Sequence, residues 1–218
     1  MKSQDPNQEH LQSIINLFTQ GQLQLALSEA TKMLERFPNS VVFYNIAGAC
    51  NAGLMQFDAA IINYKKAIKI KPDYAVAYYN MGIALNNKGD LEAAIESYKQ
   101  ALKIKPDYAQ AYNNMGNTLK EKGDLDAAII SYKEAIKIKP DYAEGHSNLG
   151  DAFQLLNQTE LALVSYEKAI TLKKDFNAAI SGLGIALLKK GEHSKGLDKL
   201  RQGDGSILFN IKCGFSIK

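Results

Sequence analysis

The sequence predicts an all-α protein built from antiparallel helix pairs, arranged as about six repeats of 34 residues. The pentapeptide Lys-Pro-Asp-Tyr-Ala occurs at 71–75, 105–109 and 139–143, always at the same spacing. A Gly-Asp dipeptide lies between successive copies, at 89–90 and 123–124. Apolar residues recur at helical spacing between these signals. A fixed period of this size is typical of stacked units, none of which can bury its apolar face alone.

Each pentapeptide is predicted to end one helix and to begin the next. Proline cannot continue a helix, and it disfavours the helical conformation in the residue before it. Asp73, Asp107 and Asp141 are then expected to accept hydrogen bonds from the first backbone N–H groups of the following helix. Glu144 lies three residues after Asp141, which is the spacing of a capping box.

The Gly-Asp dipeptides predict a tight turn inside each repeat. Gly89 and Gly123 are expected to adopt the left-handed conformation that ends a helix, and Asp90 and Asp124 to cap the helix that follows. In the fifth repeat Asn157 stands where the third and fourth repeats have glycine. We expect it to adopt the same conformation, because asparagine tolerates the left-handed region better than most other residues. Each repeat is therefore predicted to be two helices joined by a turn.

The period divides the chain into a lead-in, an array of repeats and an extension. In the extension Ile207, Phe209 and Ile211 alternate with other residues, which predicts a short strand that has no partner strand in this chain. We interpret the extension as a segment packed on the last helix, or as the start of a domain that is missing here. The boundaries that we expect are a lead-in at 1–6, repeats at 7–40, 41–74, 75–108, 109–142, 143–176 and 177–203, and the extension at 204–218.

Composition and charge exclude several classes of function. A net charge of +3 is too small to indicate nucleic acid or an acidic membrane surface as the partner. Cys50 and Cys213 form no spacing pattern, which favours a reducing compartment. The polar N-terminus and the absence of a long apolar run predict a soluble cytoplasmic protein. The three histidines lack metal-ligand spacing and no catalytic motif occurs, so we expect no enzyme activity, metal or cofactor.

The fourth repeat resembles the tetratricopeptide repeat (TPR) family, and the resemblance extends over roughly residues 7–203. The matching residues are Tyr112, Met115, Gly116, Leu119, Ala128, Tyr132, Ala135 and Pro140. The resemblance implies a right-handed superhelical solenoid with a concave groove lined by the first helix of each repeat. It also implies that the chain binds proteins or peptides and performs no chemistry itself.

Differences between the third and fourth repeats indicate where a ligand could bind. The two repeats are identical at 24 of 34 positions, and half of the differences fall on one face of the first helix. The resemblance assigns this face to the groove. Either the residues of a solvated face have changed without consequence for function, or the chemistry of a groove varies along its length. The differing pairs on this face are Val76/Gln110, Tyr79/Asn113, Ile83/Asn117, Asn86/Lys120 and Asn87/Glu121.

Asparagines recur on the first helices, at Asn80, Asn114 and Asn148. They resemble the asparagine ladder in the repeat domain of O-linked N-acetylglucosamine transferases, in which asparagines hold the backbone of an extended peptide. An amide carries both donors and an acceptor, so it can pair with any peptide unit. The alternative is that these asparagines satisfy polar groups between neighbouring repeats. The candidate peptide-binding residues are Asn45, Tyr79, Asn80, Asn113, Asn114, Asn117 and Asn148.

The sequence gives less support to two other binding modes. The carboxylate clamp of some TPR proteins needs lysine, arginine and asparagine on the groove face, whereas the corresponding places hold Asn45, Ala49, Tyr79 and Asn80. Lysines on the second helices could follow a nucleic acid, but they also complement helix dipoles and solvate an outer surface, so we predict no nucleic-acid partner.

Two hypotheses about function remain open. The first is an interaction scaffold that binds an extended peptide or a partner helix in its groove. The second is the N-terminal repeat arm of a larger bacterial transferase or oxygenase, truncated here, which the hydrophobic ending at Phe215–Ile217 suggests. An in-frame continuation of the gene beyond Lys218 would distinguish the second from the first.

Overall fold

The computed structural model describes residues 8–204, 207–210 and 214–217. The chain forms two compact units, residues 1–107 (unit 1) and 108–218 (unit 2). The lead-in at 1–6, Ile211 and Cys213 lie outside the described residues, so the expectations about them stay expectations.

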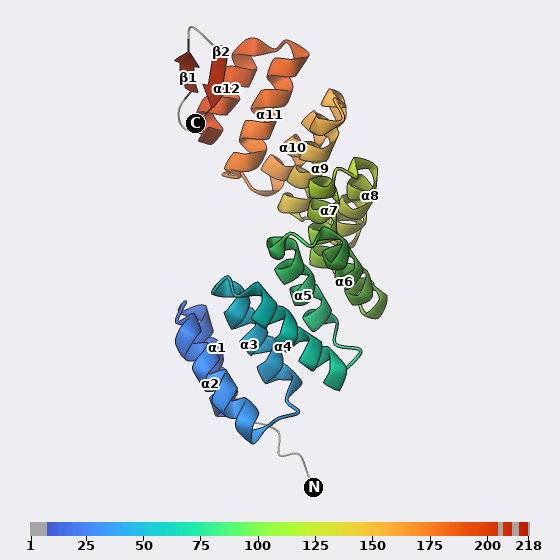
Figure 1. Ribbon diagram of the computed structural model, residues 1–218. Coiled ribbons are helices and arrows are strands. Elements are labelled where there is room, and N and C mark those ends of the chain that lie inside the picture. The colour runs from blue at the N-terminus through green and yellow to red at the C-terminus, as the bar shows by residue number, and fades with distance from the viewer. Residues whose placement is uncertain (1–7, 205–206, 211–213, 218) are drawn as a thin grey trace. The chain divides into compact units, whose positions relative to one another are not determined.

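Unit 1 consists of three helix pairs, labelled in Figure 1. Within this unit, helices that are neighbours in the sequence pack against each other. The helices are α1 (Gln8–Thr19), α2 (Leu23–Arg36), α3 (Val41–Gly53), α4 (Phe57–Ile70), α5 (Ala75–Lys88) and α6 (Leu91–Ile104).

Unit 2 repeats this arrangement and ends in a hairpin. Its helices are α7 (Ala109–Lys122), α8 (Leu125–Ile138), α9 (Ala143–Leu155), α10 (Thr159–Leu172), α11 (Asn177–Lys190) and α12 (His193–Asp204). The expectation of about twelve helices is confirmed for the part of the chain that the structure describes.

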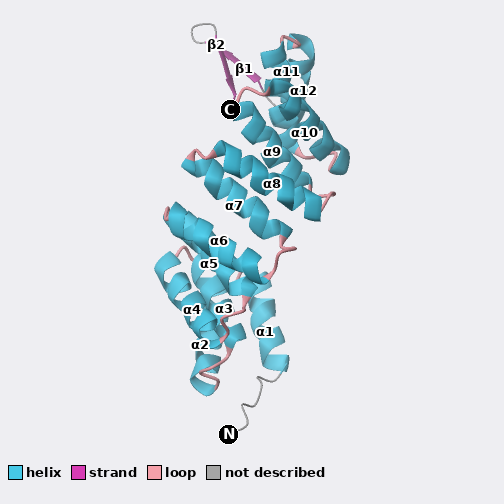
Figure 2. Cartoon of the chain, turned by 90° about the vertical axis from the view of Figure 1, so that its right-hand side faces the viewer, coloured by secondary structure: helices cyan, strands magenta, loops and turns pink. Residues whose placement is uncertain are grey.

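The predicted C-terminal strand is present, but the expectation that it has no partner strand is wrong. Strand β1 (Ile207–Asn210) pairs antiparallel with β2 (Gly214–Ile217), with Ile207 opposite Ile217 and Phe209 opposite Phe215. Figure 2 shows the two strands in magenta. The alternation in β1 was visible in the sequence, whereas the pairing requires the chain to reverse direction after Asn210, which an alternating pattern does not reveal.

The Gly-Asp turns form as predicted. Gly89 and Gly123 have φ values of +89° and end α5 and α7, and Asn157 has a φ of +58° after α9. The side chains of Asp90 and Asp124 accept hydrogen bonds from the backbone N–H groups of Ala93 and Ala127, each at 3.2 Å.

The Pro-Asp turns form differently from the prediction. The helices after them begin at Ala75, Ala109 and Ala143, so the residue at the N-cap is a tyrosine, which makes no side-chain capping bond. Asp73, Asp107 and Asp141 therefore lie one residue too early to cap. The expected capping box at Glu144 does not form either, and the Glu144 carboxylate instead lies 3.6 Å from the Lys173 ammonium group.

A close contact between glycine and tyrosine holds each inner helix pair together. A Cβ atom at Gly116 would lie 2.5 Å from Cε1 of Tyr132, which is fully buried. The same contact joins Gly48 to Tyr64, Gly82 to Tyr98 and Gly150 to Tyr166. Because the ring occupies the space of a side chain, only glycine lets the two helices approach this closely.

We predict that Gly116→Leu destabilises the fold by about 1–3 kcal/mol, the usual cost of overpacking. The change should be measured as the free energy of unfolding in urea. Tyr132→Leu provides the matched test, because it removes the ring that a leucine at position 116 would meet. The double variant should therefore lose less stability than the sum of the two single losses. Strictly additive losses would show that Gly116 does not depend on this ring.

The buried thiol of Cys50 makes stability depend on alkaline pH. Cys50 lies in the core between α1, α2 and α3, and burial raises the pKa of its thiol to about 11. In the unfolded chain the thiol ionises at its ordinary pKa of about 8.5. Between these values the unfolded state binds fewer protons, so the free energy of unfolding falls as pH rises.

We expect the urea midpoint of the parent chain to fall between pH 8 and 10. The contribution of this thiol is at most about 1.4 kcal/mol per pH unit. Cys50→Ala has no thiol to ionise, so its stability should change less over the same range. Parallel pH profiles for the two chains would contradict this account.

Candidate peptide-binding groove

The face formed by the variable positions of the first helices is called the groove face here. In unit 1 it contains the half-buried side chains of Asn45 on α3 and of Tyr79 and Asn80 on α5. In unit 2 it contains Asn114 and Asn117 on α7 and Asn148 on α9, which are also half-buried.

An amide pair links the second and third repeats across the groove face of unit 1. Nδ2 of Asn80 donates to Oδ1 of Asn45 at 3.0 Å. The Asn80 oxygen and the Asn45 amide group have no other partner among the described residues. They remain able to accept and to donate a hydrogen bond, as pairing with a peptide unit would require. Tyr79 precedes Asn80 in the sequence, and its ring contacts the ring of Tyr98, with 6.1 Å between the ring centroids.

The same kind of pair occurs in unit 2. Nδ2 of Asn148 donates to Oδ1 of Asn113 at 3.0 Å, and Nδ2 of Asn113 lies 3.5 Å from Oδ1 of Asn114. Asn113 is only 4% exposed, so it accepts the hydrogen bond of Asn148 from within the interior and is not available to a ligand. Asn117 accepts a hydrogen bond from the hydroxyl of Tyr132 at 2.8 Å.

These bonds change the interpretation of the predicted ladder. Asn80 and Asn148 each donate to an asparagine of the preceding repeat, so part of their hydrogen-bonding capacity already joins neighbouring repeats. The sequence indicates these pairs only by a spacing of 35 residues, one more than the repeat period of 34, from Asn45 to Asn80 and from Asn113 to Asn148. At Gly182, where the sequence breaks the ladder, a Cβ atom would lie 2.5 Å from the Tyr166 ring, which leaves no room for asparagine.

A hollow on the groove face of unit 1 was not predicted from the sequence. It has a volume of about 310 Å³ and lies between α1, α3 and α5. Its lining combines the amide pair with apolar side chains, namely Ile15, Phe18, Asn45, Ile46, Ala49 and Asn80. Ile15 and Phe18 are each 37% exposed, so these large side chains have apolar surface that no other part of the described chain covers.

The groove face of unit 2 is polar and its side chains are bonded to one another. The Lys120 ammonium group lies 3.3 Å from a carboxylate oxygen of Asp151, in the next repeat. The other oxygen of Asp151 accepts a hydrogen bond from the Tyr166 hydroxyl at 2.8 Å. Burial of the Tyr166 ring, and next the charge of Asp151, raise the pKa of this hydroxyl well above its ordinary value, so it stays a donor at neutral pH. The two units thus offer different chemistry on equivalent faces.

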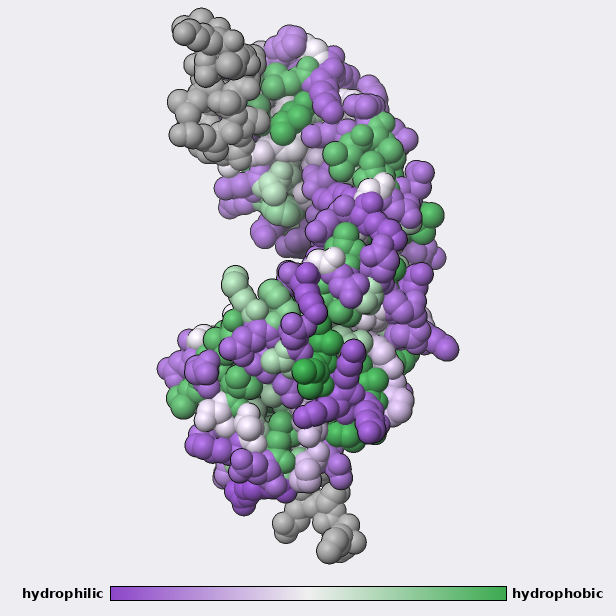
Figure 3. Space-filling model, viewed as in Figure 1, coloured by the Kyte–Doolittle hydropathy of each residue, from purple (hydrophilic) through white to green (hydrophobic). Residues whose placement is uncertain are grey.

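We call the exposed face of the second helices the outer surface. The lysines on them are exposed, as expected for a solvated surface, at Lys65, Lys66, Lys69, Lys99, Lys103, Lys133 and Lys137. In Figure 3 hydrophilic groups cover much of the visible surface of α7 to α10, with an apolar patch over α9 and α10.

The described residues contain neither a metal-binding cluster nor a membrane-spanning helix. No group of three or more His, Cys, Asp or Glu side chains there is arranged to hold a metal ion. No helix within those residues combines the length and the apolar character needed to cross a bilayer.

The fold and its groove face define a helix-pair repeat protein, and comparison with known proteins identifies the family. The TPR repeat model matches residues 56–89, 84–123 and 116–157, and the tetratricopeptide repeat model matches residues 143–176. The matches together extend over more than half of the chain. The chain belongs to the tetratricopeptide repeat family, whose members are generally non-enzymatic scaffolds for protein–protein interaction.

Solved structures agree with this assignment. The chain is similar to MamA, at 27% identity and a TM-score of 0.66, over 72% of this chain and 91% of that one. It shares its fold with YrrB, described as a TPR protein with an unusual peptide-binding site, at 18% identity and a TM-score of 0.65, over 81% and 91% of the chains. PilF of Pseudomonas aeruginosa is similar at 23% identity and a TM-score of 0.68, over 75% and 76%. No curated relative has a significantly similar sequence. The predicted fold class, a solenoid of antiparallel helix pairs, is confirmed.

We predict a measurable coupling between Asn45 and Asn80. Alanine at either position breaks their hydrogen bond, which contributes about 0.5–1.5 kcal/mol, and a second alanine at the other position removes nothing further from that bond. The coupling should be measured by urea unfolding of the two single variants and the double variant. Asn45 with Asn87, which is exposed on the same helix as Asn80, is the matched control and should show additive losses. Additive losses for Asn45 with Asn80 would argue against a stabilising pair.

Proposed function

We propose that the chain is an interaction scaffold that binds an extended peptide along its groove face, with the main site in unit 1. In this site the hollow receives an apolar side chain of the peptide, and the amide pair Asn45–Asn80 contacts the peptide backbone beside it. The observation that carries the proposal is that one hollow of about 310 Å³ is lined both by apolar side chains and by these two amides.

Exposed apolar side chains support an apolar segment as the ligand of unit 1. Besides Ile15 and Phe18, the groove face has Val42 and Val76, each of which is the second residue of its repeat. Their exposed fractions are 39% and 37%. Their surface would be removed from water by a bound apolar side chain. Full burial of one such side chain contributes about 1.5–3 kcal/mol, which exceeds the contribution of one hydrogen bond.

The amide pair supports an extended backbone, as opposed to a partner helix. An extended peptide leaves its N–H and C=O groups available, whereas a helix uses them internally. The unpartnered Asn80 oxygen can accept from one N–H group, and the Asn45 amide group can donate to a C=O group. These two contacts do not depend on the peptide's side chains, so sequence preference would come from the hollow.

The proposal is tested by filling the hollow. Ala49 lines it, and the equivalent residue of the next repeat is Ile83, so Ala49→Ile introduces a side chain that the fold already accommodates at this position. A peptide selected from a random display library on the parent chain, then synthesised, should bind Ala49→Ile at least about tenfold more weakly, because it loses the burial of its apolar side chain. Titration calorimetry would measure both affinities.

The control is a variant of the outer surface, in which Lys99, Lys103 and Lys133 are changed to alanine. Its affinity for the same peptide should stay unchanged at physiological salt, because exposed charges at a distance are screened. Equal affinity of the parent and Ala49→Ile, together with weaker binding by the lysine variant, would move the binding surface from the groove face to the outer surface.

A further inference from the structure

A second hollow lies in unit 1, on the other side of helix α3. It has a volume of about 480 Å³ and lies between α2, α3 and α4; we call it the outer cleft. From α3 it is lined by Tyr44, Ala47 and Asn51, which share one helix face because they are spaced by three and four residues. The groove hollow uses Asn45 and Ala49 of the same helix, so the two sites do not share residues.

The outer cleft exists because two side chains are replaced relative to the next repeat. Ala47 and Asn51 correspond to Met81 and Leu85, which lie 34 residues later and are buried, at 9% and 8% exposure. The larger apolar pair fills the interior of the next repeat, whereas alanine and asparagine leave space and bring a polar group to it. The packing of the helices therefore does not by itself require this cavity.

The polar groups of the outer cleft are mainly hydrogen-bond acceptors. Nδ2 of Asn51 donates to the backbone oxygen of Ala47 at 2.9 Å, and Nδ2 of Asn63 donates to that of Ala59 at 3.0 Å. The two amide oxygens are left without a protein partner in the described part of the chain. In the described part of the chain, every fully buried side-chain oxygen or nitrogen has a hydrogen-bond partner. The oxygen of the nearly buried Asn51 has no protein partner there, so this atom must be accessible to solvent. The cleft is the open space beside it.

A carboxylate and a hydroxyl add to these acceptors. Glu35 at the end of α2 lines the cleft and is exposed. The hydroxyl of Thr31 donates to the backbone oxygen of Leu27 at 2.8 Å, so it faces other groups as an acceptor. At the equivalent positions of the next repeat stand Lys65 and Lys69, so this acceptor set does not continue along the array.

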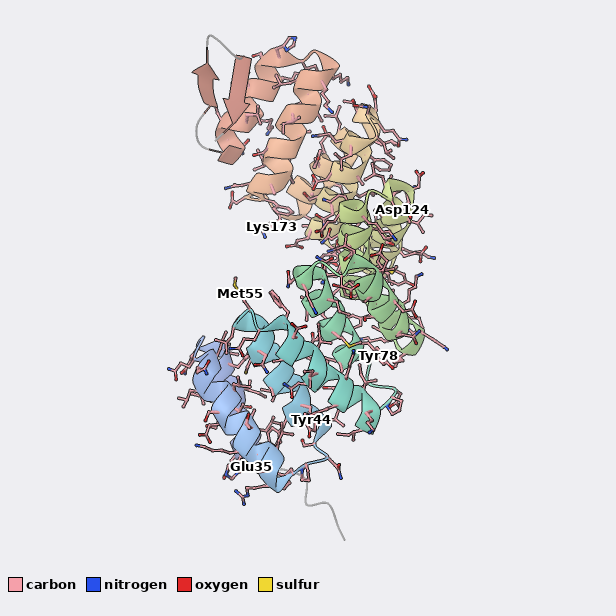
Figure 4. All side chains as sticks on the ribbon, viewed as in Figure 1. Glu35, Tyr44, Met55, Tyr78, Asp124 and Lys173 are labelled. Atoms are coloured by element: carbon pink, nitrogen blue, oxygen red, sulfur yellow. The ribbon has the colours of Figure 1, made fainter. Side chains whose placement is uncertain are left out.

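An aromatic face completes the site and already holds a cation. The ammonium group of Lys66 lies 5.5 Å from the centroid of the Tyr44 ring, within the range of a cation–π interaction. Lys66 is exposed and extends from a flexible stem, so another cation can replace it. Figure 4 labels Glu35 and Tyr44 in this part of unit 1.

We propose that the outer cleft binds the guanidinium group of an arginine side chain from a protein partner. A guanidinium group is planar, always charged and carries five N–H donors and no acceptor, so it can stack on Tyr44 while it donates to Glu35 and to the amide oxygens of Asn51 and Asn63. The apolar floor suits the methylene stem of arginine. This site is separate from the groove face and does not depend on the peptide proposed to bind there.

The test uses N-acetyl-arginine amide as the probe and N-acetyl-citrulline amide as its neutral isostere. Each is titrated into the full ¹⁵N-labelled chain, and the side-chain amide signals of Asn51 and Asn63 are followed by NMR. The arginine probe should shift these signals saturably, and the citrulline probe should not at the same concentration. Equal shifts with both probes, or none with arginine, would overturn the proposal.

Three variants define the site further. Asn51→Leu introduces the residue found at Leu85, fills the cleft and should abolish binding; the Asn63 signal reports on it. Glu35→Gln keeps the shape of an exposed side chain and should weaken arginine binding about two- to fivefold, as expected for an exposed ion pair. Lys66→Ala removes the competing cation and should strengthen binding. Arginine binding that is undiminished in both Asn51→Leu and Glu35→Gln would place the probe elsewhere.

Discussion

The contact between a glycine on the first helix and a tyrosine on the second recurs in the four inner repeats, and the remaining structure depends on it. At Gly48, Gly82, Gly116 and Gly150 a Cβ atom would lie 2.5 to 2.7 Å from a tyrosine ring carbon. The tyrosines are buried almost completely, at 0–2% exposure. A residue with any side chain at these positions would separate the helices, because a packed interior has no space to absorb it. The period of the sequence is therefore a packing requirement that each repeat meets in the same way.

Because this packing set occupies the interior of each helix pair, the first helices can vary on their remaining faces without loss of the fold. Helix α3 shows the consequence most clearly. One of its faces brings Asn45 and Ala49 to the groove hollow, and another brings Ala47 and Asn51 to the outer cleft. In α5 the equivalents of Ala49, Ala47 and Asn51 are Ile83, Met81 and Leu85, which are larger or apolar. The cavities thus arise where small or polar residues replace large ones, and helix α3 of the second repeat contributes to both of them.

Polar residues on the groove faces join neighbouring repeats, and some of them keep hydrogen-bonding groups that the described chain does not use. Asn80 and Asn148 form hydrogen bonds to the preceding repeat, and Lys120 pairs with Asp151 of the following one. Such bonds fix neighbouring repeats relative to each other within a unit. In unit 1 the amide pair keeps an unused acceptor and donor beside an apolar hollow, whereas in unit 2 Asn113 is buried and the charged groups satisfy one another. For this reason the peptide site that we propose lies in unit 1.

The sequence by itself determined the repeat length, the helix pairs, the left-handed turns at Gly89 and Gly123 and the caps at Asp90 and Asp124, because these follow from local backbone chemistry that a repeated motif displays. It did not determine the start of the helices after the Pro-Asp turns, where the N-cap is Tyr108 and Asp107 lies too early, since a shift of one residue is invisible in the periodicity. The pairing of β1 with β2 and the two hollows were decided by tertiary structure alone, and so was the choice of which asparagines pair with one another. They depend on which side chains of different helices meet and how much space those side chains leave, and neither quantity is a property of any single segment.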